Sequence, residues 1–257
     1  MTIVPNVVHF IYPCWELTRP LSFLNYMAVK MAHDVQKPDE IKFWIDGKPK
    51  PSQWWDAIQP LVTVEHVSFD HSFGGTEIIW PQYVSDVYRL QILKKHGGIY
   101  MDTDMLLLLP LHEWMNKKLV MAWEPSGDVS ICNALIISPP DNPFIDLWLE
   151  RLPQALKSNV WANGGVNLPA EITKSHGFTT REFSEIIHSQ FFCPLDLFRN
   201  WLFSTDPQII KEAEDRTRFS YSIHGFETYW REIVKDITPQ WCKDNDSLFS
   251  RIVRVYG

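Results

Sequence analysis

The stretch SDVYRLQILKKHGGIYMDTDMLLLL, Ser85–Leu109, decides how this chain is organised. It predicts a helix over residues 83–96 that ends at a left-handed Gly97, because the basic residues of the last turn suit the negative end of the helix dipole. A buried strand over residues 99–101 follows and stops at Asp102 and Asp104, before a run of leucines. Charged side chains beside such an apolar strand indicate a functional site.

Asp102 and Asp104 are separated by one residue, and side chains at i and i+2 of an extended strand point the same way. Two carboxylates so placed repel each other unless a cation lies beside them. Mg²⁺ and Mn²⁺ prefer oxygen ligands and bridge readily to phosphates, so the pair predicts a metal–diphosphate site at the carboxyl end of a strand. The alternative is two solvated aspartates in a turn.

Asp86 and Arg89 lie on one face of the preceding helix, at positions i and i+3. The Gly97–Gly98 turn lets this helix pack close to the following strand, so both charged groups can approach the cavity that the aspartates face. The alternative is an ordinary ion pair on the surface.

Strand and helix patterns alternate along the rest of the chain with short connections, which is typical of a parallel α/β sheet. We expect further strands at residues 3–12, 42–45, 62–67, 119–123, 130–138 and 219–224. We expect helices at residues 21–35 with Ser22 as a cap, 52–61, 143–157, 180–189 and 207–217, and an amphipathic tail at residues 247–256. Residues 71–75 and 161–169 are expected to be loops. Since no repeat or linker divides the chain, a single domain over residues 1–257 is predicted.

Composition narrows the class of protein. The chain is 45% hydrophobic and 21% charged, which suffices for a sizeable core. Its formal net charge of −7 argues against a nucleic-acid-binding protein. The four cysteines are too widely spaced for a zinc clip or a disulfide framework, so they are predicted to be reduced, packed thiols. No run is long and apolar enough to span a bilayer. We therefore expect a cytoplasmic protein, or a catalytic domain trimmed from a membrane-anchored parent. Peripheral contact with a membrane is compatible with either.

The combined pattern of the central stretch is Ser-Asp, an Arg three residues on, and Gly-Gly-x-Tyr-x-Asp-x-Asp. It resembles the signature of the DXD-containing glycosyltransferases of the sugar-binding-region family. That family includes yeast initiating α-1,6-mannosyltransferases and animal α-1,4-galactosyl- and N-acetylglucosaminyltransferases, and the glucosylating clostridial toxins carry a related core. Val7–Tyr12 (VVHFIY), residues 132–143 (CNALIISPPDNP) and 222–230 (SIHGFETYW) add weaker similarity. Tyr12 stands where the family commonly has Trp, and residues 161–169 (WANGGVNLP) replace its Thr-Gly-Pro.

The resemblance implies a GT-A fold, with a Rossmann-like, mostly parallel sheet flanked by helices. The nucleotide-sugar half would cover residues 1–110 and the acceptor-side half residues 111–257. It also implies a retaining, metal-dependent transfer of a hexose from a nucleotide diphosphate sugar to a glycan, glycolipid or protein hydroxyl. UDP-hexose is favoured over GDP-mannose as the donor, and Mn²⁺ or Mg²⁺ is the expected cofactor.

Carried onto this sequence, the resemblance implies catalytic roles for Asp86, Arg89 and Asp104. The implied donor-binding residues are Tyr12, Asp86, Arg89, Tyr100, Asp102 and Trp230, the last as a lid over the diphosphate. The implied metal ligands are Asp102, Asp104 and His224, and Glu124 and Asn133 are expected to face the acceptor. Two other functions fit the same residues. One is a metal-dependent phosphohydrolase, and the other is a nucleotide-sugar-binding protein without turnover.

Overall fold

The structure is a computed structural model that describes the chain apart from residues 1–3, 14–18, 79, 126, 128 and 176–184. The beginning of the predicted first strand and the first half of the predicted helix at residues 180–189 lie outside the described residues. Within them, no helix has both the length and the apolar character needed to cross a bilayer.

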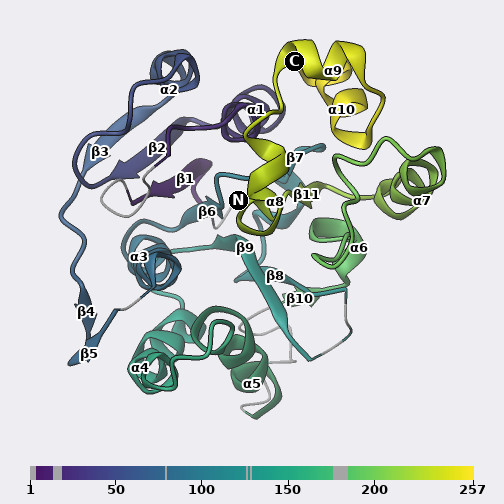
Figure 1. The fold of residues 1–257 in the computed structure, drawn as a ribbon. Coiled ribbons are helices and arrows are strands. Elements are labelled where there is room, and N and C mark those ends of the chain that lie inside the picture. The colour runs from purple at the N-terminus through teal and green to yellow at the C-terminus, as the bar shows by residue number, and fades with distance from the viewer. Residues whose placement is uncertain (1–3, 14–18, 79, 126, 128, 176–184) are drawn as a thin grey trace.

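The described residues form a central sheet of seven strands in the order β10-β8-β9-β6-β1-β2-β3 (Figure 1). These strands are β1 (Val7–Tyr12), β2 (Glu40–Ile45), β3 (Thr63–His66), β6 (Gly98–Met101), β8 (Val120–Trp123), β9 (Ile131–Ser138) and β10 (Glu185–Ile187). β1 pairs in parallel with β2 and β6, β2 pairs in parallel with β3, and β10 pairs in parallel with β8. Only β9 runs antiparallel to its neighbours, β6 and β8, so the predicted mostly parallel sheet is confirmed.

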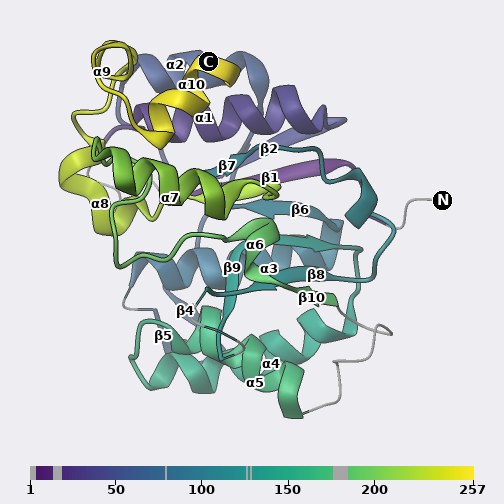
Figure 2. The same ribbon diagram turned by 90° about the vertical axis from the view of Figure 1, so that its right-hand side faces the viewer.

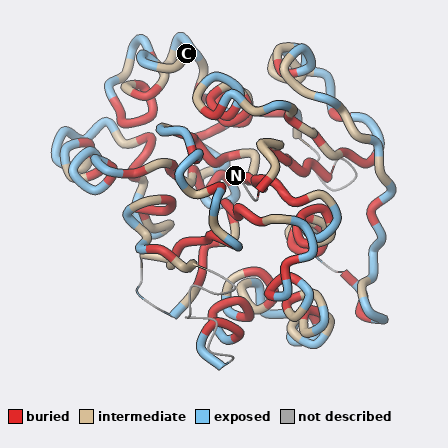
Figure 3. Tube along the Cα trace, turned by 180° about the vertical axis from the view of Figure 1, so that it is seen from behind, coloured by how far each residue is buried: buried red, intermediate tan, exposed pale blue. Residues whose placement is uncertain are grey.

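Helices cover both faces of this sheet (Figure 2). One face carries α1 (Phe23–Met31), its π-helical extension (Ala32–Gln36) and α2 (Gln53–Ile58), with the short 3-10 turn Gln59–Leu61. The other carries α3 (Pro81–His96), α4 (Pro143–Lys157) and α5 (Leu168–Ser175). β1 alternates between the two faces, since Phe10 belongs to the hydrophobic cluster with residues of α1 and α2, and Ile11 to the cluster with residues of α3 and α4. Figure 3 shows the buried residues concentrated along these strands and on the inner sides of the helices.

A C-terminal layer packs beside the carboxyl ends of the strands. Its elements are α6 (Ser189–Phe192), α7 (Pro207–Thr217), β11 (Ser222–His224), α8 (Glu227–Val234), α9 (Pro239–Asp244) and α10 (Leu248–Tyr256). The 3-10 turn His112–Trp114 lies near the amino end of β1, where the Val4 N–H donates to the Met115 carbonyl over 3.1 Å. β11 pairs antiparallel with β7 (Met105–Leu107), which places His224 opposite Met105. The leucine run after the two aspartates therefore forms a small second sheet with a strand from the end of the chain.

Two glycines allow the close approach of α3 to the sheet. Gly97 has a φ of +61°, and a Cβ there would lie 2.7 Å from the ring of Pro140. Gly98 has a φ of +110°, and a Cβ would lie 2.6 Å from the carbonyl oxygen of Val7 on β1. The predicted positive φ of Gly97 is confirmed, although its ψ of −167° is extended rather than left-handed helical. No side chain fits at either position.

Three expectations from the sequence are wrong. Residues 71–75 do not form a simple loop, because β4 (Ser72–Phe73) and β5 (Thr76–Glu77) pair as a hairpin. Residues 161–169 are largely helical, with a π-helical turn (Asn163–Asn167) that leads directly into α5. The described part of residues 180–189 contains strand β10, because its β-branched residues complete the hydrogen bonds of the sheet edge at β8.

Candidate active site

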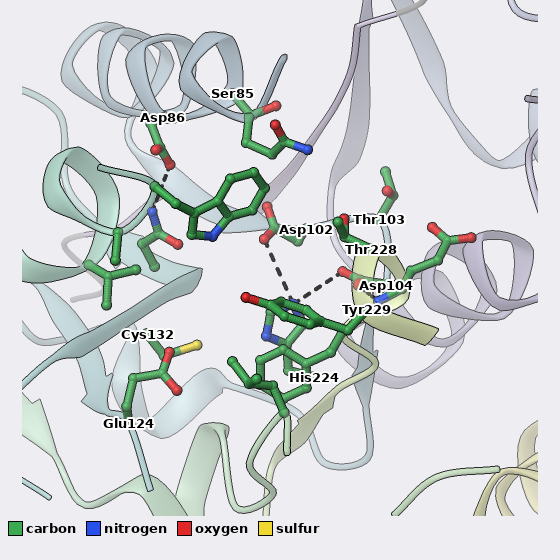
Figure 4. A pocket seen from close by; sticks show the side chains of 18 of the residues that line it. Ser85, Asp86, Asp102, Thr103, Asp104, Glu124, Cys132, His224, Thr228 and Tyr229 are labelled. Carbon is green, nitrogen blue, oxygen red and sulfur yellow. Dashed lines mark hydrogen bonds and ion pairs between the residues drawn. The ribbon is translucent and has the colours of Figure 1, made fainter. Parts of the chain in front are cut away.

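A cavity of about 410 Å³ opens at the carboxyl ends of β1 and β6. This is the position predicted from the two aspartates that follow β6. Its lining includes nine of the ten predicted site residues: Tyr12, Asp86, Arg89, Tyr100, Asp102, Asp104, Glu124, Asn133 and His224. The residues labelled in Figure 4 lie on α3, in the β6–β7 turn, directly after β8, and on β9, β11 and α8.

Asp86, Arg89 and Asn133 form a buried hydrogen-bonded group on one wall of the cavity. Asn133 donates its side-chain amide to Asp86 Oδ1 over 2.8 Å, and Arg89 Nη2 lies 3.2 Å from the same oxygen. Arg89 also donates to the Asn133 carbonyl over 2.7 Å. Burial raises the pKa of Asp86 to about 6, against the opposing charge of Arg89. The surface ion pair considered from the sequence is excluded, because the side chains of Asp86 and Arg89 are only 9% and 4% exposed.

Arg89 connects this wall to the first aspartate of the DXD motif. Its guanidinium lies 4.5 Å from the centre of the Tyr100 ring, and Nη2 lies 3.5 Å from Asp102 Oδ1. The Tyr100 hydroxyl donates to the same oxygen of Asp102. Two carboxylates therefore balance one buried guanidinium, which satisfies the rule that a buried charge needs partners.

Asp102, Asp104 and His224 offer three ligand atoms that all lie within 4.8 Å of one another. His224 Nε2 is 3.4 Å from Asp104 Oδ1 and 4.0 Å from Asp102 Oδ2. The aspartates lie in a turn between β6 and β7, where the Met105 N–H donates to the Asp102 carbonyl over 3.0 Å. They converge because of this turn, and the expectation that they continue an extended strand is wrong.

Backbone hydrogen bonds from the segment after β11 hold Asp104 in position. The Gly225 N–H donates to the Asp104 carbonyl over 2.8 Å, and the Glu227 N–H donates to Asp104 Oδ2 over 2.7 Å. Burial raises the pKa of Asp104, but His224 and the Glu227 N–H outweigh it and hold this pKa below its usual value. Burial likewise opposes the charge of His224, yet Asp104 and Cys132 hold the pKa of the imidazole well above its usual value.

These three side chains fit a divalent cation. Two carboxylates and one imidazole are a donor set typical of Mn²⁺ or Mg²⁺ bound beside phosphates. In the structure His224 is the positive partner of the two carboxylates. A cation at this position would take over that role, with the imidazole neutral and its lone pair free for coordination.

An ion-pair network supports the aspartate turn, and no local sequence signal predicted it. Arg19 lies 2.7 and 2.9 Å from the two carboxylate oxygens of Glu227, although the residues are 208 positions apart. The Asn25 side-chain amide donates to Glu227 and to the Thr103 carbonyl, both over 3.0 Å. Arg19 and Glu227 both line the cavity. A cavity-lining arginine is a further cationic group near the aspartate turn.

Glu124 and Cys132 form the wall opposite Asp86 (Figure 4). Burial raises the pKa of Glu124 to about 8, and the neighbouring Cys132 adds to the effect. A hydrogen bond with the Cys193 thiol and the proximity of His224 lower the pKa of Cys132 to about 5, against burial. The predicted reduced, packed thiols are confirmed for Cys132, Cys193 and Cys242, while Cys14 lies outside the described residues. That Cys132 lines the cavity and contacts Cys193 was not predicted.

Exposed aromatic side chains stand at the mouth of the cavity. Trp161, Phe198 and Tyr229 all line it and are 41%, 83% and 54% exposed. Trp80, which is 42% exposed, packs edge-to-face against Trp161 with the ring centres 6.3 Å apart. Trp230 is the predicted site residue outside the lining. Its side chain packs against the hydrophobic clusters, which leaves its neighbour Tyr229 on the cavity side.

Comparison with known proteins agrees with this geometry. The family model described as the glycosyltransferase sugar-binding region containing the DXD motif matches residues 22–121, which include α3 and both aspartates. Over these residues the chain is similar to this glycosyltransferase family. The match indicates an enzyme of the glycosyltransferase class.

Two relatives and one solved structure illustrate the similarity. Glucan organizing enzyme 1 of Cryptococcus neoformans var. grubii is 27% identical over 272 residues, covering 99% of this chain and 71% of the relative. Human alpha-1,4-N-acetylglucosaminyltransferase is 27% identical over 161 residues, covering 59% of this chain and 44% of its own length. The bifunctional glycosyltransferase WbbM superposes with a TM-score of 0.50 at 9% identity, over 87% of this chain and 45% of its own. That likeness concerns the fold alone, and the GT-A fold expected from the sequence is confirmed.

Proposed function

We propose that this glycosyltransferase moves a hexose from a nucleotide diphosphate sugar to an acceptor hydroxyl in a metal-dependent, retaining reaction. One observation carries the proposal: a single cavity holds the cation-type ligand set Asp102, Asp104 and His224 beside the buried group of Asp86, Arg89 and Asn133. The first set would bind the diphosphate through a cation, and the second set would form hydrogen bonds with the sugar hydroxyls.

The wall around Asp86 suits recognition of the donor sugar. An ionised Asp86 accepts hydrogen bonds from hydroxyls, and the Arg89 guanidinium donates them in a fixed planar geometry. Asn133 was expected to face the acceptor, but its 2.8 Å hydrogen bond to Asp86 favours a donor-side role in positioning that carboxylate. Tyr12 and Tyr100 are aromatic residues of the cavity lining, and we keep them as candidates for binding the nucleotide.

Departure of the nucleoside diphosphate leaves negative charge at the aspartate turn. A divalent cation bound by Asp102, Asp104 and His224 supplies electrostatic stabilisation of that charge. Arg19, held against Glu227, adds fixed positive charge to the same end of the cavity. Retention follows from attack on the same face, with the leaving phosphate accepting the acceptor's proton as the anomeric carbon gains oxocarbenium character.

The cavity mouth favours a glycan among the three acceptor types considered. Four of the five exposed aromatic residues found among the described residues gather there: Trp80, Trp161, Phe198 and Tyr229. Aromatic faces pack against the apolar faces of sugar rings, while the polar edges of the sugar remain solvated. Burial raises the pKa of Glu124 to about 8, so in this proposal it would donate a hydrogen bond to an acceptor oxygen at neutral pH. The names of both relatives, which refer to glucan and to N-acetylglucosaminyl transfer, agree with a carbohydrate product.

A thermal-shift screen of nucleotide sugars with and without Mn²⁺ tests the proposal. One nucleotide sugar should stabilise the protein by about 2.7 kcal/mol when present at 100 times its Kd, and only with the metal. Radiolabelled sugar should then appear in a glycan product with the anomeric configuration of the donor. Release of phosphate from simple esters without sugar transfer would favour the phosphohydrolase instead. Metal-dependent binding with neither transfer nor donor hydrolysis would identify the non-catalytic binding protein.

A further inference from the structure

A second ligand set lies on the far side of His224 from the aspartates. Cys132 Sγ, Cys193 Sγ and a ring nitrogen of His224 all lie within 4.8 Å of one another. Figure 4 shows Asp102 and Asp104 on one side of the imidazole and Cys132 with Glu124 on the other. His224 Nδ1 is buried and has no well-aligned hydrogen-bond partner among the described residues, whereas Nε2 faces the carboxylates.

The backbone holds these ligands in place before any ion binds. Cys132 belongs to β9, where it pairs with Ala122 of β8. Cys193 ends α6, and the preceding carbonyl, that of Phe192, accepts a 2.8 Å hydrogen bond from the Ser222 hydroxyl of β11. His224 lies two residues further along β11. Three separate elements therefore converge on one buried point, and Cys132 and His224 connect it to the cavity.

We propose that Cys132, Cys193 and His224 form a binding site for a soft divalent cation such as Zn²⁺, and that occupation of this site withdraws His224 from the hard-metal site. Two thiolates and an imidazole are a ligand set characteristic of Zn²⁺ and poor for Mg²⁺ or Mn²⁺. Binding requires two thiolates and a neutral imidazole, so the protons that these groups carry, including the Nδ1 proton of His224, leave to solvent. The ion and its two thiolates then form an electrically neutral unit.

The competition follows from the chemistry of imidazole. A neutral imidazole has one lone pair and one N–H, so it ligates one metal at a time unless it loses its second proton. With Zn²⁺ on Nδ1, the hydrogen stays on Nε2 and points at Asp104, 3.4 Å away. The DXD motif then keeps two carboxylates but loses its third ligand. Zn²⁺ should weaken Mn²⁺ binding and inhibit transfer without occupying the sugar wall; this consequence rests on the proposed function.

Co²⁺ is the probe for the site, because it replaces Zn²⁺ and gives thiolate-to-metal charge-transfer absorption. We expect one equivalent of Co²⁺ to produce this absorption in the reduced wild-type protein, and one equivalent of Zn²⁺ to remove it. Cys193→Ser should lower the absorption, because it removes one of the two thiolates, and should weaken Zn²⁺ binding by more than the 10–100-fold typical of losing an outer-shell partner. Cys242→Ser is the matched control, since Cys242 is also buried but lies in α9, within another hydrophobic cluster.

The outcomes separate the two proposals. Absence of charge-transfer absorption in the wild type, or absorption of unchanged intensity in Cys193→Ser, overturns the soft-metal site. If Cys193→Ser does not fold, the stoichiometry of Zn²⁺ in the wild type and its protection of Cys132 and Cys193 from alkylation decide the question. Mn²⁺ affinity that stays constant as Zn²⁺ binds overturns the sharing of His224. A protein that binds Co²⁺ as expected but never binds a nucleotide sugar with Mn²⁺ refutes the proposed function and leaves the cysteine site intact.

Discussion

Gly165 is a position where a single methyl group tests the donor-sugar wall. A Cβ at Gly165 would lie 2.3 Å from Asn133 Nδ2 and 2.6 and 2.7 Å from the carboxylate oxygens of Asp86. Ordinary contacts begin at 3.4 Å, so Gly165→Ala forces these groups to retreat by roughly 1 Å, a displacement that can cost about 100-fold in rate. The φ of Gly165 is not in the left-handed region, so its backbone accepts alanine without strain.

The assay is kcat/KM for transfer, measured beside the melting temperature of each variant. A 100-fold loss corresponds to about 2.7 kcal/mol of transition-state stabilisation. Gly164→Ala is the control in the same π-helical turn, because its Cβ would meet only the ends of two flexible side chains, Leu152 at 3.0 Å and Leu156 at 3.3 Å. Equal losses of kcat/KM in the two variants, or a wild-type rate in folded Gly165→Ala, would refute the assignment of Asp86 to the donor.

The remaining predictions concern charge. Asn133→Ala removes a hydrogen bond that favours ionised Asp86, so the pKa of Asp86 should rise above about 6. The acidic limb of the pH profile of kcat/KM should then move to higher pH. An acidic limb that does not move would contradict the role of this hydrogen bond. Asp104→Asn should abolish the Mn²⁺-dependent thermal shift, as should excess chelator with the wild type, and metal binding that persists in this variant would exclude Asp104 as a ligand. His9 has its pKa lowered to about 4 by burial, so the unfolded chain binds more protons between pH 6.5 and 4. The free energy of unfolding, measured by denaturant titration, should therefore fall by up to about 3 kcal/mol as the pH is lowered from 6.5 to 4. His9→Gln should make the free energy of unfolding less dependent on pH in this range.

Elements with local signals were predictable from the sequence. The helix expected at residues 143–157 is found as α4, because Asn142 caps it and Pro143 occupies its first position. Ser22 caps α1 as expected, and the glycine turn after α3 brings Asp86 and Arg89 to the aspartates. These features depend on residues close together in the chain, so pattern and spacing carry the information.

Features that depend on distant partners were not predictable. β10 exists because β8 offers an open edge, and the π-helical turn at residues 163–167 forms against Asp86 and Asn133. The ion pair between Arg19 and Glu227 and the hydrogen bond between the thiols of Cys132 and Cys193 each join segments that share no sequence pattern. Cavity-lining residues outside the DXD signature, namely Tyr12, Glu124, Asn133 and His224, were predicted from the weaker family similarity. Arg19, Cys132 and Glu227 became apparent as lining residues only once the chain was folded.

Phe226 shows how the C-terminal layer is bound to the DXD motif. Its φ of +48° and ψ of +45° are left-handed, which costs a non-glycine residue about 1–3 kcal/mol. The cost is offset because the ring packs on His224, with centres 4.0 Å apart, and because the turn aims the Glu227 N–H at Asp104. Removing the Asp104 side chain therefore releases this turn, and with it Tyr229 at the cavity mouth, as well as the metal site. Asp104→Asn loses the charge but retains a side-chain oxygen that can accept from the Glu227 N–H, whereas Asp104→Ala loses both. A decrease in acceptor affinity that appears only in the alanine variant therefore comes from the loss of the turn and not from the loss of the charge.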